Sequence, residues 1–236
     1  MLRSFRFTAR LGAPLLLAVV MLTACDNEPA QRKAFIDFLQ SRIVGKPGVH
    51  VPQLTPDETA SFGDYAKQYA VITDFNAGLD RTVSPQLQHT VAGGALRSLG
   101  EVVTRRKDIA TLRDGIVAIR SELDQQLAKA DAAHAALKQP ADLKPVFDAA
   151  YDRDVTQPAK AMIAIFPDVD EAFIATLALG EFLEQHANAI KIEGSMIQIS
   201  DASLQPRLQE LLDALRAKQE TVHKAQQRLH DIAFGS

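Results

Sequence analysis

Apolar residues recur at intervals of three and four along most of the chain. This spacing places them on one face of an α-helix, so it predicts a protein built mainly of amphipathic helices. Polar and charged residues fill the positions between them, as expected for helices whose other side faces water. The predicted helices cover residues 29–44, 55–75, 96–139, 141–165, 168–189 and 201–232.

Several boundaries of these helices carry start or stop signals. Thr55-Pro56-Asp57-Glu58 predicts a helix start, with Thr as N-cap, Pro at the first helical position and acids in the first turn. Gly93-Gly94 and Pro140 predict breaks. Pro167-Asp168 predicts another break, with Asp168 as the N-cap of a new helix and Glu171 completing a capping box.

The predicted helix after Thr55 has an aromatic face. Its members are Phe62, Tyr65, Tyr69, Ile72 and Phe75. Such a row packs into a core more often than it lines a ligand pocket, and we interpret it as core. The helix over 29–44 carries a similar stripe, which could lie on a bilayer surface but is expected to pack into the domain.

The period of the pattern changes to two between residues 190 and 200, which predicts a small β-hairpin with its turn at Glu193-Gly194-Ser195. Asp201 or Ser203 is expected to open the last helix. That helix and the one over 96–139 carry heptad-like apolar tracks. The predicted fold class is therefore all-α, a multi-helix bundle with one small hairpin; two domains divided near Pro140 are the alternative.

The first residues have the layout of a secretory signal. Arg3, Arg6 and Arg10 precede an apolar run from Leu11 to Leu22, which is too short to span a bilayer comfortably. This layout predicts that the chain has three parts: a signal peptide over 1–24, a lipidated tether over 25–30 and one helical periplasmic domain over 31–236.

The end of this segment resembles the lipobox of bacterial lipoproteins. Leu22, Thr23 and Ala24 precede Cys25, the only cysteine of the chain. The resemblance implies cleavage before Cys25, a thioether-linked diacylglyceryl group and often a third acyl chain, which together make a durable membrane anchor. The alternative is a free thiol beside an ordinary signal or anchor helix.

Asp26 and Asn27 follow the predicted lipidation site. In enteric-type lipoproteins, Asp at this place resembles the signal that retains a lipoprotein on the inner membrane. We therefore expect a lipid-anchored protein of the cell envelope that faces the periplasm on the inner membrane. The outer membrane is the alternative, in which the two residues are only a polar tether.

The charge balance bears on partners. The chain has 26 Lys and Arg against 29 Asp and Glu, and removing residues 1–24 takes away three arginines and no acid, which changes the net charge from −3 to −6. This mild acidity argues against nucleic acid as a partner. A lone cysteine makes no internal disulfide, so packing must hold the fold together.

Candidate chemistry is sparse in the sequence. No phosphate loop, nucleophile elbow or zinc motif is present, so we expect no catalytic residues, metal site or cofactor. His134 is expected to be a hydrogen-bonded core or interface histidine, and His223 and His230 surface residues. An acidic stretch is interpreted as surface acids; its members are Asp142, Asp148, Asp152 and Asp154.

Two stretches carry a family resemblance. One runs from Gln31 to Gln40; the other runs from Ala130 to His134 and continues through Leu137-Lys138-Gln139 and Asp142–Asp148. With the lipobox, they resemble an uncharacterised family of proteobacterial lipoproteins of the YiaF type, whose pattern has an apolar residue where this chain has Asp26. The resemblance implies no activity.

These observations favour a non-enzymatic interaction or structural protein of the envelope, which contacts a protein partner or itself through its helices. The alternative is a carrier or sensor that holds a small apolar ligand between helices.

Overall fold

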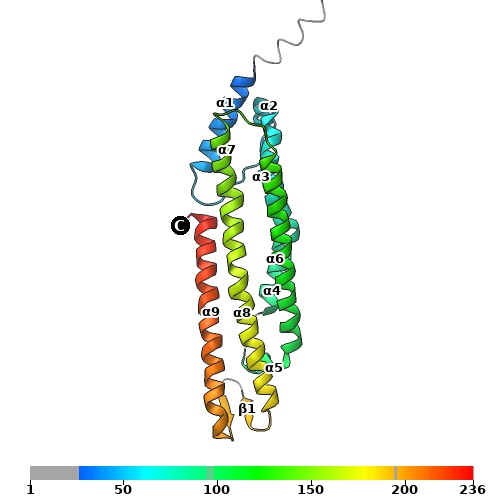
Figure 1. Ribbon diagram of the computed structural model, residues 1–236, viewed down its shortest axis with the longest axis vertical. Coiled ribbons are helices and arrows are strands. Elements are labelled where there is room, and N and C mark those ends of the chain that lie inside the picture. The colour runs from blue at the N-terminus through cyan, green and yellow to red at the C-terminus, as the bar shows by residue number, and fades with distance from the viewer. Residues whose placement is uncertain (1–26, 95, 97, 194–195, 236) are drawn as a thin grey trace, which may run out of the picture.

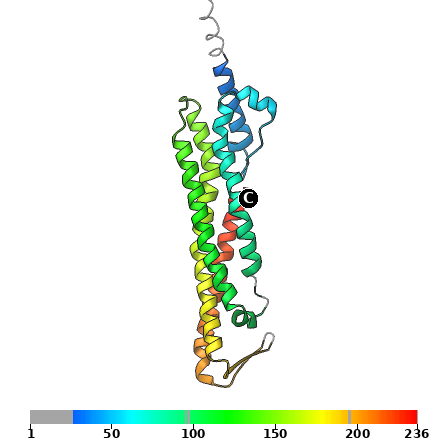
Figure 2. The same ribbon diagram turned by 90° about the vertical axis from the view of Figure 1, so that its right-hand side faces the viewer.

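The computed structural model describes residues 27–94, 96, 98–193 and 196–235 as a long helical rod (Figure 1). Most helices run along its long axis, and the views in Figures 1 and 2 agree that the hairpin lies at the end opposite α1. In chain order the elements are α1 (Glu28–Leu39), η1 (Gln40–Val44), α2 (Pro56–Phe62), α3 (Tyr65–Thr82), α4 (Ser84–Gly94), α5 (Gly100–Thr104), α6 (Arg106–Ala135), α7 (Lys144–Tyr151), η2 (Asp152–Thr156), α8 (Gln157–Gln185), β1 (Ile190–Glu193), β2 (Met196–Ile199), η3 (Ala202–Leu204) and α9 (Gln205–Phe234).

The predicted all-α bundle with a small hairpin is confirmed. β1 and β2 pair antiparallel, with Ile190 opposite Ile199 and Ile192 opposite Ile197. A two-stranded hairpin is marginal alone, and here its isoleucines pack against the ends of α8 and α9. Gly194 and Ser195 of the predicted turn lie outside the described residues.

The beginning of the bundle follows its local signals. Thr55 caps α2: its side chain accepts from the backbone of Glu58, whose carboxylate accepts from the Thr55 N–H in return. The aromatic face predicted after it is buried on α2 and α3, with Tyr69 1% exposed. The stripe over 29–44 also packs inward, since Phe35 and Ile43 are fully buried. Both interpretations as core are confirmed.

Several predicted boundaries differ from the structure. The helix predicted over 55–75 is divided after Phe62 and continues to Thr82, and α4 was not predicted. α1 begins at Glu28, inside the predicted tether over 25–30. The helix predicted over 96–139 is divided at Arg105 into the short α5 and the long α6. The stretches Gln40–Val44 and Asp152–Thr156 are π-helical turns, which no periodicity in the sequence indicated.

The break predicted at Pro167 is wrong. α8 continues through Pro167, so Asp168 is not an N-cap. The proline lies on the exposed side of the helix, while Phe166 on the inward side is 5% exposed. Packing of the inward side against α6 and α9 outweighs the hydrogen bond that the proline removes.

Two hydrophobic cores occupy different lengths of the rod. The larger core lies at the α1 end and contains most of the buried aromatic residues; the smaller lies at the hairpin end and is aliphatic, comprising Val102, Leu179, Leu183, Ile190, Leu208 and Leu211. α8 contributes to both cores, because Ala159 and Phe166 lie in the first and Leu179 in the second. Within the described residues, no helix combines the length and apolar character needed to cross a bilayer.

Candidate functional site

An apolar groove lies between α4 and α9 near the middle of the rod. α8 forms its floor through Val169 and Phe173, α9 forms one wall through Val222, and α4 forms the other wall through Leu87 and Gly94. The remaining lining residues are Thr90, Leu96, Ile109, Ile116, Met162, Ile165, Phe166, Ala172, Thr176, Leu215, Gln219, Gln226 and Leu229. We call this the α4–α9 groove.

The groove consists of two cavities joined end to end. One has a volume of about 360 Å³ and the other about 320 Å³. They share Gly94, Val169, Phe173 and Val222, so the two spaces are neighbours along α8 and α9. Each volume lies near the lower end of the range found for small-molecule sites.

The position of α4 opens this groove. α4 packs mainly on α3 and α6, whereas α9 packs along α8. A Cβ on Gly93 would meet the Leu112 side chain at 3.0 Å, so the glycine lets α4 lie close to α6. α4 is drawn toward α6 and away from α9, and the apolar face of α8 between them is left partly uncovered.

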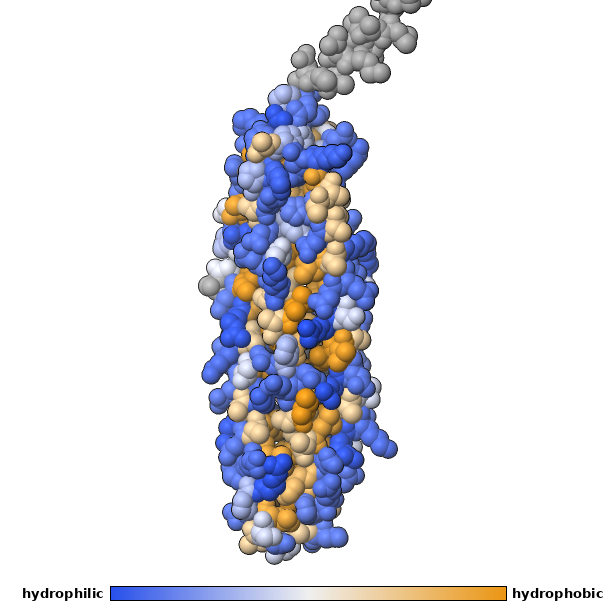
Figure 3. All heavy atoms as spheres, in the orientation of Figure 1, coloured by the Kyte–Doolittle hydropathy of each residue, from blue (hydrophilic) through white to orange (hydrophobic). Residues whose placement is uncertain are grey.

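The charged residues near the groove pair with each other. Arg113 of α6 donates through Nε to Asp170 of α8 at 2.6 Å, and a second nitrogen donates to the other carboxylate oxygen at 3.1 Å. Lys218 of α9 pairs with Glu171 of α8. None of these four residues lines the groove. Figure 3 shows small apolar patches along the face where α8 lies, flanked by hydrophilic side chains.

Asp154 is the second unusual feature, and it corrects the sequence interpretation. The acid was expected on the surface, but the π-helical turn η2 directs it inward, where it is fully buried. Its Oδ1 accepts from the His50 N–H at 3.1 Å, while Oδ2 has no partner among the described residues. Burial raises the pKa of Asp154 to about 7, against smaller opposing effects of the His50 N–H and Arg153.

Hydrogen bonds around Asp154 hold the loop that follows η1 in place. Besides the bond to His50, Arg153 donates through Nε to the Gly48 carbonyl at 3.1 Å, and Tyr69 donates to the Pro52 carbonyl at 3.0 Å. Burial and the nearby Asp154 raise the pKa of Tyr69. The arrangement therefore positions a loop, and it does not bring a nucleophile and a base together.

The other three acids of the stretch remain at the surface, as expected. Asp142 pairs with Arg32 at 3.1 Å, and Asp152 accepts from Gln157 at 2.7 Å. Asp148 accepts from both His134 and Lys144. Burial alone would raise the pKa of Asp148, but the hydrogen bonds from Lys144 and His134 outweigh it and hold the pKa below its usual range.

His134 joins α6 to α7, which confirms it as a hydrogen-bonded interface histidine. Its Nε2 lies 2.9 Å from an Asp148 oxygen, and its ring stacks on Tyr151 with centroids 4.1 Å apart. His223 and His230 are exposed on α9, as expected. Among the described residues, no group of three or more His, Cys, Asp or Glu side chains is placed to hold a metal ion.

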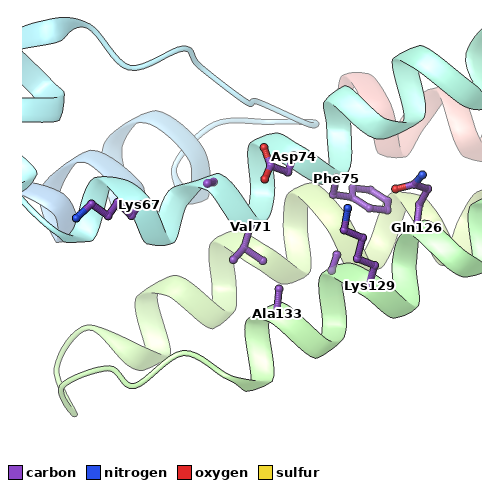
Figure 4. Close-up of a pocket in the computed structure, with 9 residues that line it drawn as sticks. Lys67, Val71, Asp74, Phe75, Gln126, Lys129 and Ala133 are labelled. Atoms are coloured by element: carbon purple, nitrogen blue, oxygen red, sulfur yellow. The ribbon is translucent and has the colours of Figure 1, made fainter.

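A third hollow, of about 270 Å³, lies on the surface between α3 and α6. Figure 4 shows Gln126 and Lys129 extending from α6 toward Phe75 of α3. Lys67 and Asp74 of α3 lie along the same hollow. Its mixed lining has fewer apolar residues than the α4–α9 groove, which is therefore the better candidate for an apolar ligand.

The predicted lipidation residues cannot be placed against these features. Leu22, Thr23, Ala24, Cys25 and Asp26 lie outside the described residues. Asn27 is described: it is exposed, and its carbonyl accepts from the N–H of Gln31 at the start of α1. The polar residue predicted as part of the sorting signal thus leads directly into the folded bundle.

Sequence reasoning did not identify the groove. The heptad-like apolar track of the last helix contains Leu215, Val222 and Leu229, and from the sequence that track was assigned to helix contacts. In the structure these three residues are only half-buried. The sequence carried no signal that the apolar face of α8 would be left partly uncovered, because this depends on how far α4 lies from α9.

Comparison with known proteins gives a family-level match. A family model described as "Protein of unknown function (DUF3053)" matches residues 13–230. Relatives named "Uncharacterized protein YiaF" from Escherichia coli (strain K12) and Shigella flexneri are each 31% identical to the chain over 221 residues, covering 92% of the chain and 93% of the relative. No solved structure matches the chain.

Proposed function

The chain belongs to the DUF3053 family of proteins of unknown function, and from this premise we propose that it is a lipid-anchored protein facing the periplasm. In this proposal Cys25 carries the lipid, and the helical bundle acts as a non-enzymatic interaction or structural protein of the cell envelope. Asp26 and Asn27 favour the inner membrane. The family match itself assigns no activity.

The observation that carries the proposal is the short distance between Cys25 and the first helix. α1 begins at Glu28, so the three residues 25–27 are the whole tether and span at most about 11 Å when extended. A lipid on Cys25 would therefore hold the α1 end of the bundle against the membrane. α8 alone, with 29 residues, is about 43 Å long, so the hairpin end would project well away from the bilayer.

Lipidation is tested by mass analysis of the native chain isolated from membranes. We expect a chain that begins at Cys25 and carries acyl groups, and we expect Cys25→Ser to lose palmitate labelling and to keep the signal peptide. An intact Met1 or an unmodified thiol in the unaltered chain would contradict the anchor. Replacing Asp26 by Ser tests the membrane assignment separately, because it should shift the lipidated protein toward the outer membrane.

The interaction role needs its own test. Crosslinking in the intact envelope, followed by identification of the product, should capture a protein partner or a second copy through the projecting helices. Exposed apolar residues offer starting points for such contacts; they are Val117, Ile174, Met196 and Phe234. A chain that yields only uncrosslinked monomer in the envelope would count against this role.

A second candidate function is binding of a small apolar ligand between the helices. The α4–α9 groove supports it, because its lining is mostly apolar and its two cavities have volumes suited to a small molecule. The two functions use different parts of the bundle. Ligand binding requires only the groove and leaves free the helix surfaces that the interaction role would use.

A further inference from the structure

We propose that the α4–α9 groove holds the hydrocarbon chain of a single-chain lipid, a lysophospholipid, whose head group stays in water at one end of the groove, beside the nearer of Gln219 and Gln226. This inference rests on the second candidate function and names its ligand class. It is carried by three properties of the groove: its lining, its rim and its length.

Among the described residues, the lining has no charged side chain, although ion pairs lie close to it. All members other than Thr90, Thr176, Gln219 and Gln226 are apolar residues or glycine. The Thr176 hydroxyl already donates to the Ala172 carbonyl at 2.7 Å. These lining residues offer no counter-charge to a buried charge on a ligand, whereas a hydrocarbon chain needs none.

The polar rim of the groove favours a thin hydrocarbon chain over a partner helix as the occupant. Among the described lining residues, Gln219 and Gln226 alone are exposed, and they lie seven residues apart on α9. The apolar lining is recessed, and none of the large exposed apolar residues belongs to it. A helix about 10–12 Å wide would rest on the polar rim without reaching this lining, whereas a hydrocarbon chain can enter. The glutamine amides can bond the ester and hydroxyl groups of the glycerol unit that remains outside.

The length of the groove fits one extended chain. Lining residues run from Leu215 to Leu229 on α9 and from Met162 to Thr176 on α8, which is about 21 Å along each helix. The two cavities follow one another along this length, so they offer one chain a continuous path. A lipid with two acyl chains would need the cavities side by side.

The test is equilibrium dialysis of the chain from residue 27 onward against 1-palmitoyl-lysophosphatidylethanolamine below its micelle concentration. Every residue that the two cores comprise or that packs against them lies between Ala34 and Leu215, so this part contains the folded bundle without the predicted anchor. We expect saturable binding of one lipid per chain. A decanoyl analogue should bind at least tenfold more weakly, because it fills only part of the groove.

Two variants locate the site. Val222→Phe enlarges a residue that borders both cavities, and Leu87→Phe obstructs the groove from the opposite wall. Each should weaken binding at least tenfold while circular dichroism shows a folded helical chain. The matched control is Val117→Phe, on the exposed side of α6 and outside the groove, which should bind like the unaltered chain.

Three results would overturn the proposal: absence of saturable binding to the folded chain, equal affinity for both chain lengths, or full binding by both folded groove variants. Concentration-dependent dimerisation that Val222→Phe abolishes would assign the groove to a second copy, which would also overturn it. The chain used has no Cys25, so these outcomes do not depend on whether the lipid anchor exists.

Discussion

The two ends of the rod are stabilised by different kinds of buried side chain. At the α1 end, Phe35 contacts the rings of Phe62, Tyr65 and Phe147, with centroids 5.4, 6.0 and 6.3 Å apart. At the hairpin end the buried side chains are aliphatic, and the strands contribute Ile190 to them. Large rings bury much surface per residue, so short elements such as α2 and α7 can be fixed at the aromatic end. The aliphatic end relies on the two long helices α8 and α9.

The region between the two cores explains where a ligand could enter. On α8 the groove lining runs from Met162 to Thr176, so it includes Phe166 of the aromatic core and ends just before Leu179 of the aliphatic core. α4 packs mainly on α3 and α6 and leaves this stretch of α8 partly uncovered. The groove is therefore an uncovered face of α8 where residues packed on the two cores adjoin.

The largest effect is expected from Phe35→Ala at the centre of the aromatic core. Phe35 is fully buried, so its loss should lower the free energy of unfolding by about 3–5 kcal/mol. Denaturant unfolding followed by circular dichroism measures this change. A loss below about 1 kcal/mol would show that the aromatic cluster is not what secures this end.

Leu179→Ala should have the next largest effect, about 2–4 kcal/mol, at the centre of the aliphatic core. If the two ends are packed independently, faster amide hydrogen exchange should be confined to the hairpin, α5 and the adjoining turns of α8 and α9. Equal acceleration around Phe35 would instead show that the rod opens as one cooperative unit.

The buried Asp154 adds a pH dependence to the aromatic end. Its folded pKa, about 7, lies above the ordinary value of 3.8, so the proton stabilises the folded state. That stabilisation is present at low pH and is lost as the pH rises through the folded pKa. Between pH 5 and pH 8 the free energy of unfolding should fall by about 2–3 kcal/mol from this group.

Asp154→Asn tests that dependence with a neutral side chain of the same shape. The variant should lose the pH-dependent component, while Asp152→Asn, an exposed neighbour in the same turn, should keep it. The measurement is denaturant unfolding at several pH values for the three chains. Parallel pH profiles for Asp154→Asn and the unaltered chain would contradict the assignment.

The smallest effect is expected at the edge of the aromatic end, from the helix cap. Thr55→Ala removes the side-chain acceptor for the Glu58 N–H and should lower the free energy of unfolding by about 1 kcal/mol. Thr59→Ala, one turn further into the same helix, is the control and should change stability less, because it removes no cap. Equal losses for both would show that the capping box contributes little.

Local sequence signals predicted much of the fold. The N-cap at Thr55, the aromatic face ending at Phe75, the break at Gly93-Gly94 and the hairpin after Ile190 all follow from neighbours within a few residues. Each depends on short-range hydrogen bonds or on the period of burial, which the order of residues expresses directly. The family resemblance drawn from the stretches around Phe35 and His134 is likewise confirmed.

The sequence offered a ligand held between helices as an alternative function, but it did not locate the candidate site. Its lining comes from α4, α6, α8 and α9 together with Leu96, and no single segment of it is unusual. Thr90 and Val222 are separated by more than half the chain, so only their meeting in space makes them neighbours. The apolar track of α9 was predicted to make helix contacts, and it does contact α8. The prediction missed that part of this track lines the groove, because α4 does not cover it.

The order of residues by itself determined most of the helices, the cap at Thr55 and the hairpin, because those features depend on groups close together along the chain. Tertiary packing alone decided that α8 passes through Pro167, that Asp154 is buried and that a groove lies between α4 and α9. At Pro167 and Asp154 the local preference is weaker than the free energy gained when distant apolar surfaces meet. The groove depends on the distance between two helices, which the sequence of neither helix specifies.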